Sequence, residues 1–391
     1  MKTTLGEIFE IGSGGTPSKT HPEYYGGSIP WVKTGDLKDE YLYSVEDCIT
    51  EEGLKNSSAK MYQPGTVLIA MYGATIGATS ILKFDACTNQ ACAAFKPSKD
   101  VMPEYLYYFL RSKQQKFISD GVGGAQPNIS AGYLKKVSID IRTIEEQEKI
   151  VTVLDKLNVV IKIRQREIDE LDNLIKARFV ELFGDAVANP MKWPVKKLKD
   201  LSIQINSGNT PKGGSENYVE KGITFFRSQN VWKDQLEMDD IAYIDAETHA
   251  SMKRSSLKHG DILMTKTGRI NTENSSLGRA ALYDGEDDMA NVNGHVYFIR
   301  LKKGVNNKFV LRILVSPEYR DLIRSVCVGG IDKRQLNKEH IEDFPIICPP
   351  SDMIDDYIAF VEQVDKSKVA IQKSLEKIQL LFDSLMQKYF G

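Results

Sequence analysis

The sequence predicts an α+β protein: two repeated, mixed α/β domains separated by two long helices that form an antiparallel coiled coil with pseudo-two-fold symmetry. Three observations predict this fold. One ordered set of motifs occurs twice, two segments carry apolar residues at heptad spacing, and 391 residues exceed what a single hydrophobic core usually serves.

The repeat begins with the pattern Ile-x-Ser-Gly-x-Thr-Pro. It runs from Ile11 to Pro17 and again from Ile205 to Pro211, an offset of 194 residues. At the same offset, IPWVKTGDL from Ile29 aligns with ITFFRSQNV from Ile223, apolar residue on apolar residue. A shared register over two motifs indicates a duplicated domain.

Two later motifs extend the repeat. PGTVLIAMYG, ending at Gly73, aligns with HGDILMTKTG, ending at Gly268, and each is a short apolar run between glycines that predicts a buried strand followed by a turn. Val-Gly-Gly then occurs at Val122 to Gly124 and at Val328 to Gly330.

Each half ends in a segment that predicts a long helix, residues 144–184 and 351–391, and both segments close on Phe-Gly. Their apolar residues follow a 3–4 spacing, which is typical of a coiled-coil seam interrupted by Arg164 and Lys368. The seam residues are Leu154, Leu157, Ile161, Ile168, Leu171 and Ile175, then Val361, Val364, Ile371, Leu375, Ile378, Phe382 and Leu385. Forty helical residues span about 60 Å, so we interpret these helices as spacers.

The predicted division is a first domain over 1–142, a first spacer helix over 143–189, a second domain over 190–350 and a second spacer helix over 351–391. The net charge is −2, and the two helical segments carry the excess of acidic residues. The domains are therefore neutral to slightly basic, which permits binding to a nucleic acid.

Composition indicates an ordinary soluble protein, with 41% hydrophobic and 27% charged residues, no long apolar run and no secretory signal. We therefore expect a cytoplasmic protein without a membrane segment. The five cysteines form no Cys-x-x-Cys pair, so we expect buried, reduced thiols and no metal site.

Motifs of catalysis are missing from the sequence. It has no GxxxxGK[ST], GxSxG or HExxH motif, no GxGxxG between a strand and a helix, and no (Asn/Asp)-Pro-Pro-(Tyr/Phe). The nearest string to the last, Cys348 to Ser351, is expected to end a strand. We therefore expect a binding protein with no catalytic residues and no cofactor of its own.

The motifs together resemble a known family. IGSGGTPS, GGSIPWVKTGDL, PGTVLIAMYGATIG, NQACAAFKP and a helix IEEQEKIVTVLDKL ending ELFGD, followed by a second round from NPMKWPVKKLKDLSIQINSGNTPK, resemble the specificity subunit of type I restriction-modification systems over essentially the whole chain. The resemblance implies two target-recognition domains, each recognising one half of a split double-stranded DNA target, and helices that fix the distance between the halves.

The resemblance also implies partners. These are two methyltransferase (M) subunits, which transfer a methyl group from S-adenosylmethionine to adenine, and restriction-translocation (R) subunits, which cut unmethylated DNA. S-adenosylmethionine, ATP and Mg would belong to those partners. Because the two halves differ in sequence, we expect an asymmetric target, with its half-sites in inverted relation.

Candidate DNA-contacting residues are polar side chains at turns that leave apolar strands. Arg or Lys can contact guanine O6 and N7, and Asn or Gln can contact adenine N6 and N7. The candidates at the first strand exit are Lys33, Thr34, Arg227, Ser228, Gln229 and Asn230. The alternative, which the sequence leaves open, is that these residues only cap strand ends.

Further candidates lie elsewhere in the two halves. Those at the second strand exit are Tyr72, Lys266, Thr267 and Arg269, and those expected to contact phosphates are Lys19, Lys212, Lys333 and Arg334. The alternative for each is an ordinary solvated side chain. The loop after Gly268 is longer than that after Gly73 and contains an Asn-rich insert, Asn271 to Ser276, so the two domains need not contact DNA alike.

Two other classes of protein remain open from the sequence. The chain could be the recognition part of a single-protein restriction-methylation enzyme, although no fused methyltransferase or nuclease motif is visible. It could also be a coiled-coil scaffold that binds only protein.

Overall fold

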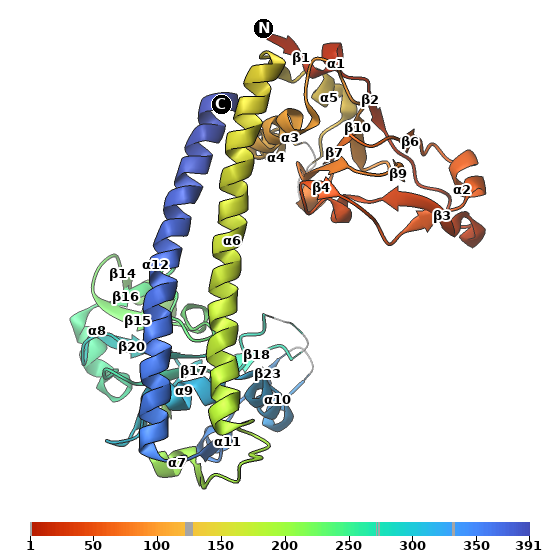
Figure 1. Cartoon of the computed structure of the whole chain (residues 1–391). Coiled ribbons are helices and arrows are strands. Elements are labelled where there is room, and N and C mark those ends of the chain that lie inside the picture. The colour runs from red at the N-terminus through yellow and green to blue at the C-terminus, as the bar shows by residue number, and fades with distance from the viewer. Residues whose placement is uncertain (1, 122–127, 271, 273, 331–332) are drawn as a thin grey trace. The chain divides into compact units, whose positions relative to one another are not determined.

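The computed structural model describes residues 2–121, 128–270, 272, 274–330 and 333–391. The chain divides into two compact units (Figure 1): unit 1 contains residues 1–168 and 370–391, and unit 2 contains residues 169–369. Each unit combines one globular region with a part of both long helices. The first Val-Gly-Gly motif and Asn271 lie outside the described residues.

Unit 1 is a mixed α/β structure. Its described strands are β1 (Lys2–Thr4), β2 (Ile11–Ser13), β3 (Tyr25–Val32), β4 (Tyr41–Leu42), β5 (Cys48–Ile49), β6 (Met61–Tyr62), β7 (Val67–Ala70), β8 (Thr79–Leu82), β9 (Ala86–Thr88), β10 (Cys92–Phe95) and β11 (Ser138–Asp140). Its helices are α1 (Leu5–Ile8), α2 (Glu51–Lys55), α3 (Pro103–Ser112), α4 (Gln114–Asp120) and α5 (Ala131–Lys135), with 3-10 turns η1 (Pro22–Tyr24), η2 (Thr34–Asp36) and η3 (Gly73–Thr75).

Unit 2 contains corresponding elements. Its described strands are β12 (Val195–Lys197), β13 (Ser202–Ser207), β14 (Tyr218–Val219), β15 (Ile223–Phe226), β16 (Ala242–Ile244), β17 (Ile262–Thr265), β18 (Thr267–Gly268), β19 (Ala280–Leu282), β20 (Ala290–Val292), β21 (Val296–Leu301), β22 (Val328–Gly329), β23 (Arg334–Gln335) and β24 (Pro345–Ile347). Its helices are α7 (Leu198–Leu201), α8 (Ala246–Ser251), α9 (Asn307–Val315), α10 (Pro317–Val326) and α11 (Lys338–Glu342), with 3-10 turns η4 (Gly214–Asn217), η5 (Ser228–Asn230) and η6 (Lys253–Ser255).

The sheets of the two units share one topology. The order β2-β10-β7-β8-β4 in unit 1 matches β13-β21-β17-β19 in unit 2, apart from the edge strand β4. Strand β3 pairs in parallel with β9, as β15 does with β20. The strand β1 pairs with β11, as β12 pairs with β24. The repeat that the sequence predicts is therefore present in the fold.

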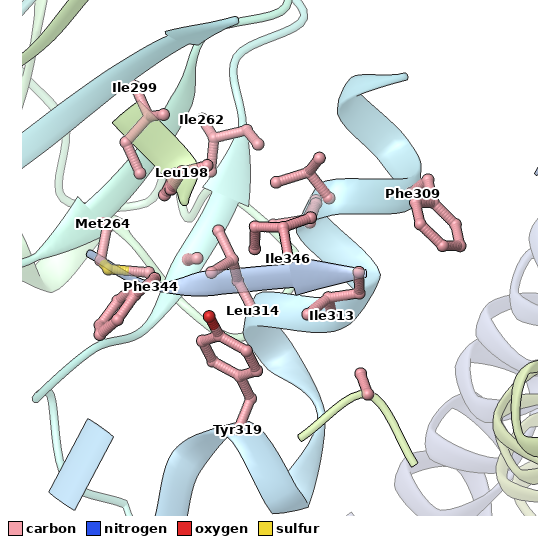
Figure 2. Packing of buried hydrophobic residues seen from close by; sticks show 14 of the residues in the cluster. Leu198, Ile262, Met264, Ile299, Phe309, Ile313, Leu314, Tyr319, Phe344 and Ile346 are labelled. Carbon is pink, nitrogen blue, oxygen red and sulfur yellow. The ribbon is translucent and has the colours of Figure 1, made fainter. Parts of the chain in front are cut away.

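The core of unit 2 lies between its main sheet and helices α9 and α10. Figure 2 shows Ile262 and Met264 of β17 among side chains from α9, α10 and the segment that ends in β24. All four residues of β17 are buried, as a continuous apolar run on a covered strand predicts. The corresponding core of unit 1 contains Val67 and Ile69 of β7 and the buried face of α3.

The long helices are α6 (Ile144–Phe183) and α12 (Ser351–Phe390), 40 residues each and drawn in yellow-green and blue in Figure 1. In unit 2, Lys368 donates to Asp172 at 2.5 Å, while the ring of Tyr357 lies 5.5 Å from that of Phe183. Higher numbers on one helix therefore meet lower numbers on the other, which is antiparallel packing.

The same direction holds in unit 1. Tyr108 of α3 donates to Asp155 of α6 at 2.7 Å and packs its ring 6.2 Å from that of Phe382 of α12. Every predicted seam residue is buried or half-buried. The predicted fold class is confirmed, while the four-part division of the chain stays a prediction.

The cysteines are free thiols. Burial raises the pKa of Cys87 to about 11 and that of Cys92 to about 12, so both stay protonated and unreactive. Cys327 is also buried, whereas Cys48 and Cys348 are only partly buried.

Candidate nucleic-acid interface

The first candidate region in each unit is the turn that follows the parallel strand pair. In unit 1 the pairing Val32 with Thr88 ends β3 immediately before Lys33, and in unit 2 the pairing Phe226 with Val292 ends β15 immediately before Arg227. Because the last residue of each strand is paired, the backbone enters the turn in a defined direction, which also orients the side chains of the turn. The two turns are thus equivalent in backbone position.

The Ser-Gly-x-Thr-Pro motif packs directly against this strand pair. A Cβ added at Gly14 would lie 1.9 Å from the carbonyl oxygen of Thr88, and one at Gly208 would lie 1.9 Å from that of Val292. Only glycine permits so close an approach of backbone to backbone. The motif is repeated because both units need the same close contact beneath the candidate turn.

In unit 1 the turn is closed by carboxylates. The side chain of Asp36 accepts a hydrogen bond from the backbone N–H of Lys33 at 2.7 Å. The Lys33 ammonium pairs with Asp47, and this hydrogen bond raises the pKa of Lys33. Thr34 begins the 3-10 turn and is partly exposed. Lys33 stays charged, but a phosphate or base would have to compete with Asp47 for it.

In unit 2 the same place in the turn is taken by Asn230, which is only 1% exposed. Its amide oxygen accepts from the backbone N–H of Arg227 at 3.0 Å, and its amide nitrogen donates to the carbonyl oxygens of Glu237 and Asp240 at 3.0 and 3.1 Å. Asn230 therefore caps the turn, in the way the alternative interpretation of these residues describes.

The other turn residues of unit 2 are more accessible. Gln229 is exposed and donates to the Asp240 carboxylate at 3.0 Å, while Arg227 pairs with the same carboxylate at 3.1 Å. The hydrogen bonds from Gln229 and Arg227 lower the pKa of Asp240. Ser228 is partly exposed. Asp240 thus orients a cation and an amide on one surface.

The second candidate region lies where β7 and β17 end. In unit 2, Thr267 and Gly268 pair with Gln335 and Arg334, which brings the predicted residues Lys266 to Arg269 beside Lys333 and Arg334. In unit 1, Tyr72, which is 43% exposed, pairs with Asn128 in the same way. Segments far apart in the sequence thus meet at the same edge of both units.

The structure places a cavity of about 510 Å³ at this edge of unit 2. Its described lining residues are Thr267, Gly268, Arg269, Thr272, Asn274, Ser275, Ser276 and Lys333. This one cavity is therefore lined both by part of the Asn-rich insert and by three of the predicted residues, Thr267, Arg269 and Lys333. Hydroxyls, amides and two cations suit a polar or anionic group such as a base edge or a phosphate.

The remaining candidates are more scattered. Lys19 and Lys212 are exposed in loops after β2 and β13 and lie apart from the lining of this cavity. Lys266 lies over the ring of Tyr297, 5.7 Å from its centroid, and Arg334 donates to the carbonyl oxygen of Cys327 at 3.3 Å. Both are partly exposed.

Arg279 belongs to this region and was missed by the sequence interpretation. Its guanidinium stacks 3.6 Å from the ring centroid of Trp232 and donates to the carbonyl oxygen of Ser275 at 3.0 Å, so it supports the cavity wall from inside. Burial lowers the pKa of Arg279, which is 8% exposed. Its place in the repeat is Ala78 in the first half, and that difference was the available signal.

Within the described ranges, no three His, Cys, Asp or Glu side chains are grouped so that they could hold a metal ion. The same part of the chain contains no helix long and apolar enough to cross a lipid bilayer.

Comparison with known proteins finds a matching family model and relatives that align over most of the chain. The family model for the type I restriction modification DNA specificity domain matches residues 1–173 and again 190–380. The MjaIX specificity subunit of Methanocaldococcus jannaschii is 28% identical over 98% of this chain and 90% of its own length. The EcoR124I/EcoR124II specificity subunit of Escherichia coli is 31% identical over 40% of each chain.

Two solved structures share the fold. The type I restriction-modification S subunit from M. genitalium aligns with a TM-score of 0.55 at 16% identity, over 100% of this chain and 96% of the other. A chain from a study of complex assembly and conformational transition of the type I R-M system aligns with a TM-score of 0.61 at 16% identity, over 100% and 97%. The chain belongs to the family of type I restriction-modification DNA specificity subunits.

Proposed function

We propose that each globular region of this chain recognises one half of a split, asymmetric DNA target. One observation carries the proposal: the same backbone scheme, with its glycine contact and parallel strand pair, presents different side chains in the two units. Lys33 and Thr34 stand in unit 1 where Arg227 and Ser228 stand in unit 2. Equal scaffolds with unequal side chains suit two different half-sites.

The interface that we propose has two parts in each unit. One is the turn after β3 or β15, where Asn230 supports the turn, Gln229 is exposed and Arg227 is partly exposed. The other is the strand exit at Tyr72 in unit 1 and at the cavity with Arg269 and Lys333 in unit 2. Exposed Lys19 and Lys212 would add phosphate contacts, which position the protein without specifying sequence.

The chain's role in this proposal is recognition, with methyl transfer and cleavage carried out by partner subunits. The M subunits would supply the S-adenosylmethionine site and the R subunits the ATP and Mg sites, in the cytoplasm where the host DNA lies. The antiparallel helices would dock the M subunits and set the gap between half-sites, because each added base pair moves a site by about 3.4 Å and rotates it by about 35°.

Exchange of a domain tests the division of labour. The full chain is expressed with its methyltransferase partner, and methylated adenines are located by sequencing the host DNA. Replacing residues 1–142 by the corresponding domain of a relative is expected to change one half of the motif, and replacing 190–350 the other half. A change in both halves after a single exchange would contradict modular recognition.

Helix insertion tests the spacing. Four residues, about one helical turn, are added to both α6 and α12 at matched heights of the seam. The gap of the split motif is expected to change while both half-sites keep their sequence. An unaltered gap would rule out the helices as the determinant of spacing.

A further inference from the structure

The turn η5 of unit 2 continues directly into a small hairpin. Val231 bridges to Leu236, and the N–H of Trp232 donates to the carbonyl oxygen of Gln235 at 3.0 Å. Asp234 lies at the tip with φ of 65°, a left-handed conformation that non-glycine residues adopt at a cost in energy. The hairpin and the turn share Asn230, so a movement of the tip would also move the turn.

Two contacts hold the tip. The backbone N–H of Asp234 donates to the carbonyl oxygen of Ala280 in β19 at 2.8 Å, and the Asp234 carboxylate pairs with the guanidinium of Arg312 on α9. The side chains of Arg312 and Asp234 are 20% and 31% exposed, so water screens this pair only weakly.

The ionic contacts continue into the long helix. Arg312 also lies 3.8 Å from the carboxylate of Asp365 on α12, and one helical turn further on Lys368 donates to Asp172 of α6 at 2.5 Å. Within unit 2 the hairpin tip is therefore linked to the helix pair through one guanidinium. Arg312 lines none of the candidate DNA-contacting surface, so any effect on recognition would be indirect.

Unit 1 has a different arrangement at this place. Tyr108 of α3 occupies the position of Arg312 and donates to Asp155 of α6, while Glu40 stands where unit 2 has Asp234. The Oε1 atom of Glu40 is buried and has no hydrogen-bond partner among the described residues. The ionic link is thus a property of unit 2.

We propose that Arg312 is a positioning residue for DNA recognition by unit 2. By fixing Asp234 at the hairpin tip, it holds η5 so that Gln229 and Arg227 present one orientation to the DNA. The inference rests on the proposed function, because it assigns the source of precision for one of the two half-sites.

The test uses the full chain in complex with its methyltransferase partner and a randomised double-stranded DNA library from which bound molecules are sequenced. Arg312→Gln keeps hydrogen-bonding capacity and removes the charge. We expect about tenfold weaker discrimination in the half-site of unit 2, since a charge-assisted hydrogen bond contributes about 1.5 kcal/mol, and no change in the other half-site. Hydrogen exchange is expected to rise in residues 228–237.

Arg324→Gln is the matched control. Arg324 lies in the same unit and pairs with Asp321 at 2.9 Å, on the solvent side of α10 and with no contact to the hairpin. We expect its motif to equal that of the wild type. The variant Asp234→Asn removes the other partner with little change in volume, and it is expected to reproduce the effect if Arg312→Gln does not fold. The double variant should be no worse than the stronger single variant.

Specific outcomes would overturn the inference. These are an unchanged motif in both single variants, equal broadening of both half-sites, or additive effects in the double variant. A wild-type complex that selects no split motif would instead contradict the proposed function, and that result is distinct from all three.

Discussion

Units 1 and 2 hold their candidate turns by the same backbone contacts but by different charges. The glycine contact and the parallel strand pair are common to both. Unit 2 places Arg312 between Asp234 and Asp365, whereas unit 1 buries Glu40, whose charge interacts with those of Asp155 and Lys162. Duplication thus preserved the scaffold of the turn, while the electrostatics beneath it diverged.

The largest expected effect concerns what the units share. Gly14→Ala and Gly208→Ala each push a Cβ to within 1.9 Å of a carbonyl oxygen, so each should destabilise its own unit by about 4 kcal/mol. Hydrogen exchange resolved by peptide measures the two units separately. Gly35→Ala, where an added Cβ meets nothing within 4 Å, is the control. Loss of protection spread equally over both units would show that they do not unfold separately.

The next effect concerns the Phe-Gly that closes each long helix. The ring of Phe183 lies 5.1 Å from that of Phe309 in unit 2, and the ring of Phe390 lies 5.0 Å from that of Tyr105 in unit 1. Substituting each by Ala leaves a cavity that should cost about 3 kcal/mol. Thermal unfolding followed by hydrogen exchange should show that Phe183→Ala destabilises unit 2 and that Phe390→Ala destabilises unit 1. The reverse assignment would contradict the packing described.

A smaller effect separates the units by charge. Asp234→Asn removes the principal partner of the Arg312 guanidinium, and among the described carboxylates Asp365, at 3.8 Å, is the one that still pairs with it. We expect unit 2 to lose about 2 kcal/mol in denaturant unfolding at pH 7, because a largely buried cation would be left poorly compensated. Asp321→Asn, which removes the exposed partner of Arg324, should change stability by less than about 0.5 kcal/mol. Equal losses of stability in the two variants would show that the buried Asp234–Arg312 pair contributes no more than the exposed Asp321–Arg324 pair.

The smallest expected effect has the opposite sign and depends on pH. Burial raises the pKa of Glu40 from 4.5, with Asp155 and Glu104 adding to the shift and Tyr41 and Lys162 opposing it. A carboxyl with a raised folded-state pKa stabilises unit 1 fully below pH 4.5, and this contribution is lost as pH rises through the folded-state pKa.

Glu40→Gln should therefore increase the stability of unit 1 by about 1 kcal/mol at pH 8, and the gain should vanish near pH 4. The exposed residue Glu46, changed to Gln, should show neither effect. A gain that stays constant between pH 4 and 8 would mean that ionisation of Glu40 is not its cause.

The sequence predicted the fold because its evidence is local or periodic. The glycine of each Ser-Gly-x-Thr-Pro motif, the heptad seams and the apolar runs at β7 and β17 each constrain one element, and their repetition constrains the arrangement. Asn230 shows where such evidence ends, since an amide at a strand end suits both a DNA contact and a cap, and only its 1% exposure separates them.

Long-range contacts were beyond prediction. Arg312 and Asp234 are separated by 78 positions, and nothing in either local sequence indicates that they meet. Arg279 carries a weaker signal, because it interrupts the alignment of the halves. The DNA-contacting residues named from the sequence stay a prediction, with Arg269, Lys333 and Thr267 brought to one cavity and Lys19 and Lys212 located elsewhere.

The main sheet of each unit tolerates a loop of different length at the same edge. Strand β7 ends at Ala70 and its neighbour begins at Thr79, whereas β17 ends at Thr265 and its neighbour begins at Ala280. The described residues in between form no rung of that ladder, so lengthening the loop shifts no strand register. Insertions and deletions at this point can therefore change the surface of a unit while its core stays unaltered.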